Sequence, residues 1–185
     1  MSHVFDTNDF HVGEAEYNVG DDKQTCPKVG CTVFHFKEPT RCVIDKLGGA
    51  VATYNGDEVD VFSANPDDCN VVDAICFSGG SNNGLCAISG VAEELMMRNV
   101  TNQQTYSESE GNFYKIPIVK GAITFSGAWG KVPRWKPPDS NLGKEALRQS
   151  DGGKSISLGQ HGAGSSSEIG SIMTNDFGVE GGQGA

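Results

Sequence analysis

The clearest hydrophobic pattern in the chain is an apolar run from Val71 to Phe77 that stops at Ser78-Gly79-Gly80. Apolar residues then recur at helical spacing, at Leu85, Ile88, Ala92, Leu95 and Met96. A short apolar run predicts a buried strand, and a spacing of three and four residues predicts a helix with one apolar face. We therefore expect a strand, a tight glycine turn and a helix over this stretch.

Two runs rich in β-branched and aromatic residues, 31–36 and 41–45, are separated by Lys37-Glu-Pro-Thr40. Runs of this composition are typical of strands, and proline fixes one backbone angle of a turn. These residues therefore predict a hairpin over 31–45.

The second half of the chain contains one more apolar segment, 116–125, which Pro117 and Gly121 interrupt. The interruptions predict one bent strand or two short ones. Ser140 is placed to cap a short helix over residues 142–149.

Three other stretches are polar or rich in glycine. Residues 1–28 predict an irregular N-terminal arm, with the folded unit over 29–185, and residues 101–114 predict a loop. Glycines and isolated apolar residues alternate over 151–185, which predicts close-packed loops and short strands that line a site. Few apolar residues follow position 158, so we expect the chain to be part of a larger folded unit.

The glycine turn is the strongest candidate for a binding site. Glycine lets the backbone approach a ligand closely, and the N–H groups at the start of a helix favour negative charge. Gly80, Ser81, Asn82 and Asn83 are therefore candidates for an oxyanion or carboxylate site, with Asn82 or Asn83 placed to cap the helix. A turn that binds nothing is the alternative. The turn lacks the glycine patterns of phosphate-binding loops.

The charge of the chain is unbalanced, with 24 acidic against 14 basic residues and a net charge of −10. An acidic balance disfavours nucleic acid and anionic membranes as partners. No stretch approaches the ~20 apolar residues that span a bilayer. The N-terminal residues lack the apolar core of a signal peptide, so we expect a cytoplasmic location.

Cysteines in that compartment stay reduced. Cys31, Cys42, Cys76 and Cys86 lie in apolar runs, where we expect them to act as small hydrophobic residues. Cys26 and Cys31 are the one close pair, and a zinc site usually needs a second. We therefore expect neither a metal nor a cofactor.

Several segments match, in order, the motifs of one enzyme family. They are Asn18-Val-Gly20, Val29-Gly-Cys-Thr-Val33, Cys42-Val-Ile-Asp45 with Gly48-Gly-Ala50, Val72 to Ser81 with Gly84-Leu85, Ile116-Pro-Ile-Val119 with Ala122-Ile-Thr-Phe125, Leu142-Gly143 with Glu145-Ala-Leu147, and Gly162-Ala-Gly164 with Gly182-Gln-Gly-Ala185. Together these segments resemble the nylon-oligomer (aminohexanoate) hydrolases and the related D-aminopeptidase-esterases and β-peptidyl aminopeptidases.

This resemblance implies an α+β fold, a four-layer αββα sandwich completed by a second chain. Enzymes of the family cleave themselves before a Ser or Thr, whose α-amine and hydroxyl then act as base and nucleophile. The chain resembles the larger (α) fragment, so the resemblance implies no catalytic residue here and a nucleophile on the partner fragment. It also implies a peptide-like or oligoamide substrate and a homo-oligomer of α/β units.

The resemblance also suggests which residues meet the substrate. The turn at Gly80–Asn83 is placed to donate hydrogen bonds to the oxyanion. Ser165, Ser166 and Ser167 follow the Gly162-Ala-Gly164 segment and are candidates for substrate contact, with loop hydrogen bonding as the alternative. Ser171 is a candidate because it falls at or near a lysine of the nylon hydrolases.

The chain differs from the family in three places, one of which is Gly162-Ala-Gly-Ser-Ser166, where the family usually has Gly-Ala/Glu-Gly-Thr-Gly. Asn83 stands where family members usually carry Tyr or Phe, and Ser171 is uncharged where a lysine is expected. These differences favour a second hypothesis, a catalytically degenerate subunit that binds a peptide or a protein partner. A histidine side chain is a common catalytic base, but nothing in the spacing of the sequence places a nucleophile beside His161.

Overall fold

The computed structural model describes residues 1–6, 8–20, 27–45, 52–56, 71–108, 111–125, 136–165, 167–169 and 179–183. Its largest unit is a mixed five-stranded sheet in the order β2-β3-β5-β8-β4, in which only β5 and β8 run parallel. The strands are β2 (Phe10–Asn18), β3 (Lys28–Arg41), β4 (Thr53–Tyr54), β5 (Val71–Ser78) and β8 (Val119–Ile123). Helices and sheets are thus both present, and the α+β class is confirmed at this level.

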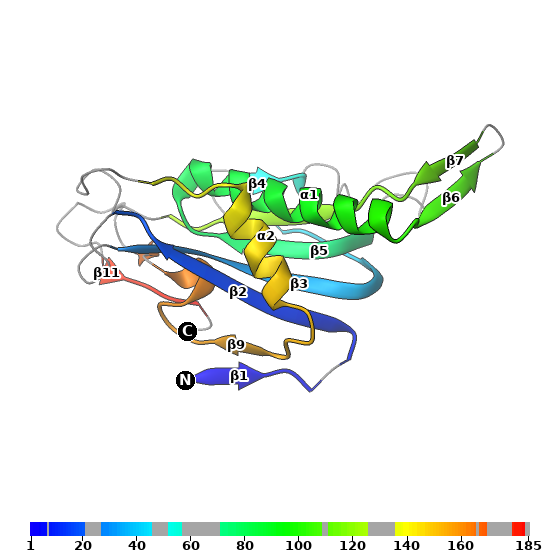
Figure 1. Ribbon diagram of the computed structural model, residues 1–185. Helices are drawn as coiled ribbons and strands as arrows, with labels where there is room; N and C mark the ends of the chain where they lie inside the picture. The colour runs from blue at the N-terminus through cyan, green and yellow to red at the C-terminus, as the bar shows by residue number, and fades with distance from the viewer. Residues whose placement is uncertain are drawn as a thin grey trace.

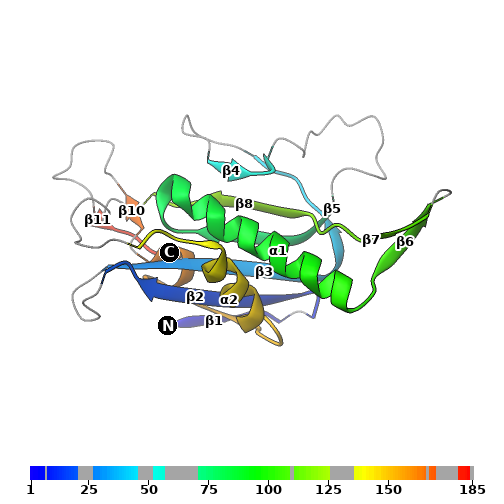
Figure 2. The same ribbon diagram turned by 45° about the horizontal axis from the view of Figure 1, so that its top comes forward.

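Two helices cover one face of this sheet, α1 (Leu85–Thr101) and α2 (Ser140–Gln149), as Figures 1 and 2 show. Alternate residues of β3 and β5, such as Cys31, Val33 and Cys76, point toward the helices and are fully buried. They pack with Ile88 and Leu147 into the main hydrophobic core. Burial of this apolar face supplies the main stabilisation of the fold.

The two helices approach each other closely at glycines. A Cβ added to Gly90 would lie 2.1 Å from the carbonyl oxygen of Ser140, and one added to Gly143 would lie 1.8 Å from that of Ala87. Both distances are far below any real contact. The missing side chains are therefore what allows α1 and α2 to lie against each other on one face.

Short elements lie on the opposite face of the sheet (Figure 1). They are β1 (Ser2–Val4) paired with β9 (Ser155–Ser157), a 3₁₀ turn at Gly162–Gly164, and β10 (Glu168–Ile169) paired with β11 (Val179–Glu180). The Val12 N–H donates to the carbonyl of Gly153 at 2.9 Å, which ties this layer to β2. The short strands predicted in the glycine-rich segment are present in its described part.

The predicted strand, turn and helix in the middle of the chain are confirmed as β5, a 3₁₀ turn (Ser81–Gly84) and α1. The predicted capping is wrong. The residue preceding α1 is Gly84, which has no side chain, and Asn82 and Asn83 are exposed without capping the helix. The 3₁₀ turn continues directly into α1, so no side-chain cap is required at this junction.

The irregular arm predicted over residues 1–28 is wrong for residues 2–4 and 10–18, which form β1 and β2, and for Lys28, where β3 begins. The hairpin predicted over 31–45 is also wrong, because β3 runs without a turn from Lys28 to Arg41. Pro39 falls where the register between β3 and β5 shifts, between His35 and Thr40. A proline is tolerated there because the ladder is already interrupted.

Two further expectations need correction. Residues 101–114 were expected to form a loop, but β6 (Thr105–Glu108) and β7 (Gly111–Tyr114) form a hairpin that projects beyond α1 (Figure 1). The second helix begins at Ser140, and its cap is Asp139, whose carboxylate accepts the N–H of Leu142. The apolar segment 116–125 contributes one strand, β8, which begins after Pro117.

Candidate functional site

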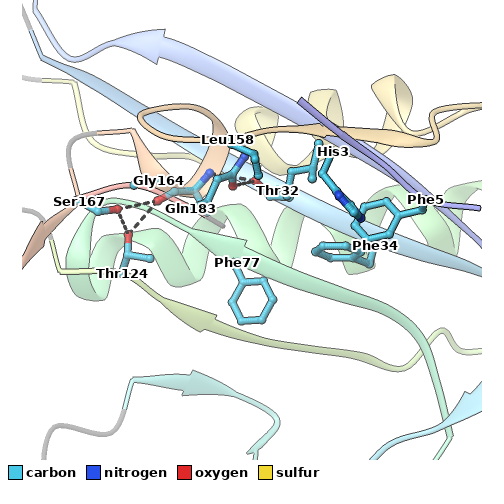
Figure 3. Close-up of a pocket in the computed structure, with 13 residues that line it drawn as sticks. His3, Phe5, Thr32, Phe34, Phe77, Thr124, Leu158, Gly164, Ser167 and Gln183 are labelled. Atoms are coloured by element: carbon cyan, nitrogen blue, oxygen red, sulfur yellow. Dashed lines mark hydrogen bonds between the residues drawn. The ribbon is translucent and has the colours of Figure 1, made fainter. Parts of the chain in front are cut away.

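A cavity of about 520 Å³ lies between the sheet and the short elements on its second face (Figure 3). It is lined by His3, Phe5, Thr32, Phe34, Phe77, Thr124, Ile156, Leu158, Ala163, Gly164, Ser167, Gly182 and Gln183. Its volume lies within the range of small-molecule sites. None of these lining residues is Asp, Glu, Lys or Arg, although the chain as a whole is strongly charged.

One end of the cavity is aromatic. The ring centroids of Phe5 and Phe34 lie 6.0 Å apart with an interplanar angle of 76°, and those of Phe34 and Phe77 lie 6.5 Å apart at 85°. Both pairs have the edge-to-face geometry that aromatic quadrupoles favour. Phe77 keeps 40% of its surface exposed, so its ring forms part of the open rim.

The other end of the cavity carries two hydroxyl groups (Figure 3). Thr124 Oγ1 and Ser167 Oγ each donate to the carbonyl of Ala163 at 3.0 Å, and the two hydroxyl oxygens lie 3.3 Å apart. A hydroxyl has one hydrogen and two lone pairs. When both hydrogens are directed at Ala163, the two oxygens retain lone pairs that can accept hydrogen bonds.

A side-chain amide fills the wall between the two ends. Thr32 Oγ1 donates to Gln183 Oε1 at 2.7 Å and accepts the N–H of Ala163 at 3.0 Å. Gln183 Nε2 donates to the Glu14 carboxylate and, at 2.7 Å, to the carbonyl of Ser157. The amide and hydroxyl of this wall are thus already paired within the chain.

Behind this wall, Glu16 holds the 3₁₀ turn onto β2. Its carboxylate accepts the N–H of Gly162 at 2.7 Å and pairs with Lys28 and with His161 Nδ1, each at 3.3 Å. Burial raises the pKa of the Glu16 carboxyl, but the Gly162 N–H, Lys28 and His161 lower it by more, so the pKa lies below its ordinary value. His161 thus pairs with a carboxylate that fastens the turn.

The predicted turn lies beside the hydroxyl end of the cavity. The N–H of Ser81 donates to the carbonyl of Thr124 at 3.3 Å, and the N–H of Gly79 donates to that of Gly30 at 2.8 Å. Gly80 has φ 99° and Ser81 has φ 50°, in the left-handed region that favours glycine. A ligand at this turn would meet Gly80 and the exposed side chains of Asn82 and Asn83, since the other two N–H groups are in use.

The serines that were predicted to contact a substrate differ in where they lie relative to the cavity. Ser165 is buried at 2% exposure, and its hydroxyl donates to the carbonyl of Gln160 at 3.5 Å, so it supports the loop and does not line the cavity. Ser167 does line the cavity. Ser166 and Ser171 lie outside the described residues.

The sequence pattern does not identify Thr32, Phe34 or Gln183 as site residues. A usable signal was present in β3, where Thr32 and Phe34 alternate with the buried Cys31 and Val33. A strand that is apolar on both faces indicates a layer on each side of its sheet. Gln183 had no such local signal, because its partners lie far away in the sequence.

Comparison with known proteins adds no assignment: no protein-family model matches the sequence, and no curated protein matches it either. Within the described ranges, no group of three or more His, Cys, Asp or Glu side chains is arranged to hold a metal ion. Among the same residues, no helix is long and apolar enough to cross a membrane.

Proposed function

We propose that this chain is the α fragment of a self-processed N-terminal-nucleophile amide hydrolase that acts on peptide-like or oligoamide substrates. In this proposal a second fragment, beginning with Ser or Thr, covers the exposed rim around Phe77 and completes a four-layer αββα sandwich. The short strands on the second face of the sheet would then belong to the second β layer. Pairs of the two fragments would assemble further into a homo-oligomer.

One observation carries the proposal. The Gly80–Ser81 turn, at the carboxyl end of β5, lies next to Thr124 at the polar end of a cavity whose described lining residues include no Asp, Glu, Lys or Arg. A hydrolase of amides needs such a combination, an apolar pocket for the substrate beside fixed donors for the oxyanion. The motif resemblance described above is strongest over Val72–Ser81, which includes this turn.

The chemistry of the proposal is a two-step acyl transfer. The α-amine of the partner's first residue takes the proton from that residue's own hydroxyl, and the oxygen attacks the amide carbonyl carbon. The proton then passes to the leaving amine as the C–N bond breaks. Water, deprotonated by the same α-amine, cleaves the resulting ester and releases the carboxylic acid. In this proposal the N–H of Gly80 and the side chains of Asn82 and Asn83 donate to the oxyanion formed in each step.

A second candidate function is ligand binding without catalysis. It is favoured by the hydroxyls of Thr124 and Ser167, which donate to the Ala163 carbonyl and so are not oriented as oxyanion donors. The side chains of Asn82 and Asn83 also have no hydrogen-bond partner among the described residues. An oxyanion site normally holds its donors in fixed positions.

The deciding experiment is intact mass measurement with N-terminal sequencing, on protein purified after expression of the complete gene. The proposal expects two polypeptides, one of which begins with Ser or Thr. Substitution of that residue by Ala should leave one uncut chain and abolish hydrolysis of oligoamides. A single uncut chain from the unaltered gene would refute the hydrolase proposal and leave the binding function.

A further inference from the structure

The two ends of the cavity differ in chemistry. Phe5 and Phe34 lie at one end, and Thr124 and Ser167 lie at the other (Figure 3). The carbonyl of Thr124 also accepts the N–H of Ser81, so the polar end lies beside the glycine turn. An elongated ligand therefore meets an apolar surface with one end and oxygen atoms with the other. The two orientations of such a ligand are not equivalent.

The cavity disfavours charged groups. None of the described lining residues carries a carboxylate, an ammonium or a guanidinium. The titratable side chain among them, His3, packs against Phe5 at the aromatic end, so a charged group at the polar end finds no compensating partner among these residues. Removing a charge from water without such a partner is costly. The amide of Gln183 and the hydroxyl of Thr32 are hydrogen-bonded to each other and to neighbouring groups. A ligand therefore does not have to supply hydrogen-bond partners for them.

The polar end accepts hydrogen bonds. Thr124 Oγ1 donates to the carbonyl of Ala163, and Ser167 Oγ donates either to the same carbonyl or to Thr124 Oγ1. In both arrangements oxygen lone pairs are the remaining hydrogen-bonding capacity of this end. A ligand group that complements this end has to donate. An uncharged donor that suits it is the N–H of an amide.

We propose that the cavity binds an uncharged secondary amide, with its apolar or aromatic group between Phe5, Phe34 and Phe77 and its N–H directed at Thr124 and Ser167. The claim that this ligand is the substrate rests on the proposed function. The claim that the cavity binds it does not. Burial of the apolar group supplies the affinity, and the N–H supplies the orientation. In this orientation the amide lies beside the Gly80–Ser81 turn.

The test is calorimetric titration of the protein purified from the complete gene with four probes. They are N-methyl-phenylpropanamide, its N,N-dimethyl analogue, phenylpropanoate and phenylpropylammonium. The secondary amide should bind about fivefold more tightly than the dimethyl analogue, which has no N–H. Both charged probes should bind at least about tenfold more weakly than the secondary amide. Equal binding of a charged probe, or no binding of the secondary amide, overturns the inference.

Two variants locate the effect. Ser167→Ala combined with Thr124→Val should reduce the preference for the secondary over the tertiary amide to about one, while Ser89→Ala, on the exposed surface of α1, should leave it unchanged. A preference that persists in the double variant overturns the inference.

The inference and the proposed function can fail separately. An uncut, inactive chain that still prefers the secondary amide supports the inference and refutes the hydrolase. A processed, active hydrolase that binds phenylpropanoate as tightly as the amide overturns the inference and leaves the hydrolase standing.

Discussion

Thr32 Oγ1 donates a 2.7 Å hydrogen bond to the side-chain carbonyl of Gln183, a residue 151 positions away in the chain. Thr32 is 1% exposed and lies in the middle of β3, so this bond joins the central sheet to the last described segment. The same oxygen accepts the N–H of Ala163. One hydroxyl thus holds two segments of the glycine-rich region against the sheet.

Thr32→Val should therefore destabilise the protein by about 1–3 kcal/mol, because the part-buried Gln183 Oε1 and the buried Ala163 N–H lose their partner. The shape of the side chain is preserved, so the loss reports the hydroxyl. Urea unfolding followed by circular dichroism measures the change. Thr40→Val is the matched control, since the Thr40 side chain is exposed and its hydroxyl donates to the nearby Glu38 carbonyl. Equal stability of the two variants would contradict the prediction.

Gly143→Ala should cost several kcal/mol, although alanine is the better helix former by about 1 kcal/mol. The new methyl would lie 1.8 Å from the carbonyl oxygen of Ala87, and backbone cannot give way as a flexible side chain does. Thermal unfolding of the variant should show a clearly lower Tm. The control is Asn141→Ala on the exposed face of the same helix, which should change Tm little. A Gly143→Ala variant as stable as the control would show that α1 and α2 can separate freely.

The sequence predicted the middle of the fold well because its pattern is local. The run from Val71 to Phe77 and the spacing from Leu85 to Leu95 each follow from one element with one buried face. The failures occur where partners are distant. In β2, Glu14 and Glu16 give the strand a polar appearance, but both point into the second layer and accept N–H groups from Ser157 and Gly162.

The candidate site, like the fold, was predictable from the sequence only where its residues are close together in the chain. The glycine turn was recognised from residues that are adjacent in sequence, and Ser167 from its place after a glycine-rich segment. The cavity itself combines β3, the residue after β8 and the segment at Gln183, and no local pattern connects these three. His161 was ambiguous from sequence because its partner, Glu16, lies 145 residues earlier on another element.

Glu16→Gln should lower stability at neutral pH by about 1–2 kcal/mol, because the charged acceptor for the Gly162 N–H is lost. The folded-state pKa of Glu16 is held below its ordinary value, so the unfolded chain binds this proton more readily. The stabilisation is therefore present above the ordinary pKa of glutamate, about 4.3, and is lost as the pH falls through the lower folded-state pKa. Urea unfolding between neutral and acidic pH should show the two proteins converging at low pH.

The matched control for Glu16 is Glu145→Gln, which removes one negative charge from the exposed surface of α2. Subtracting its effect at each pH corrects for the change in net charge. If Glu16→Gln and Glu145→Gln follow the same curve, the carboxylate of Glu16 contributes nothing specific to the attachment of the 3₁₀ turn.

Cys31 and Cys76 should be resistant to thiol reagents in the folded protein. Their Sγ atoms lie 3.3 Å apart and both residues are fully buried, whereas Cys86 is exposed on α1. Burial raises the pKa of the Cys76 thiol, and the neighbouring Cys31 raises it further. The thiolate is the reactive form, so burial slows the reaction both by blocking access and by keeping the thiol protonated.

Timed labelling with iodoacetamide, read out by peptide mass spectrometry, should show Cys86 modified first and Cys31 and Cys76 modified only as urea unfolds the chain. Modification of Cys76 at the rate of Cys86 in native buffer would mean that β3 and β5 open locally, against the packing described for this core.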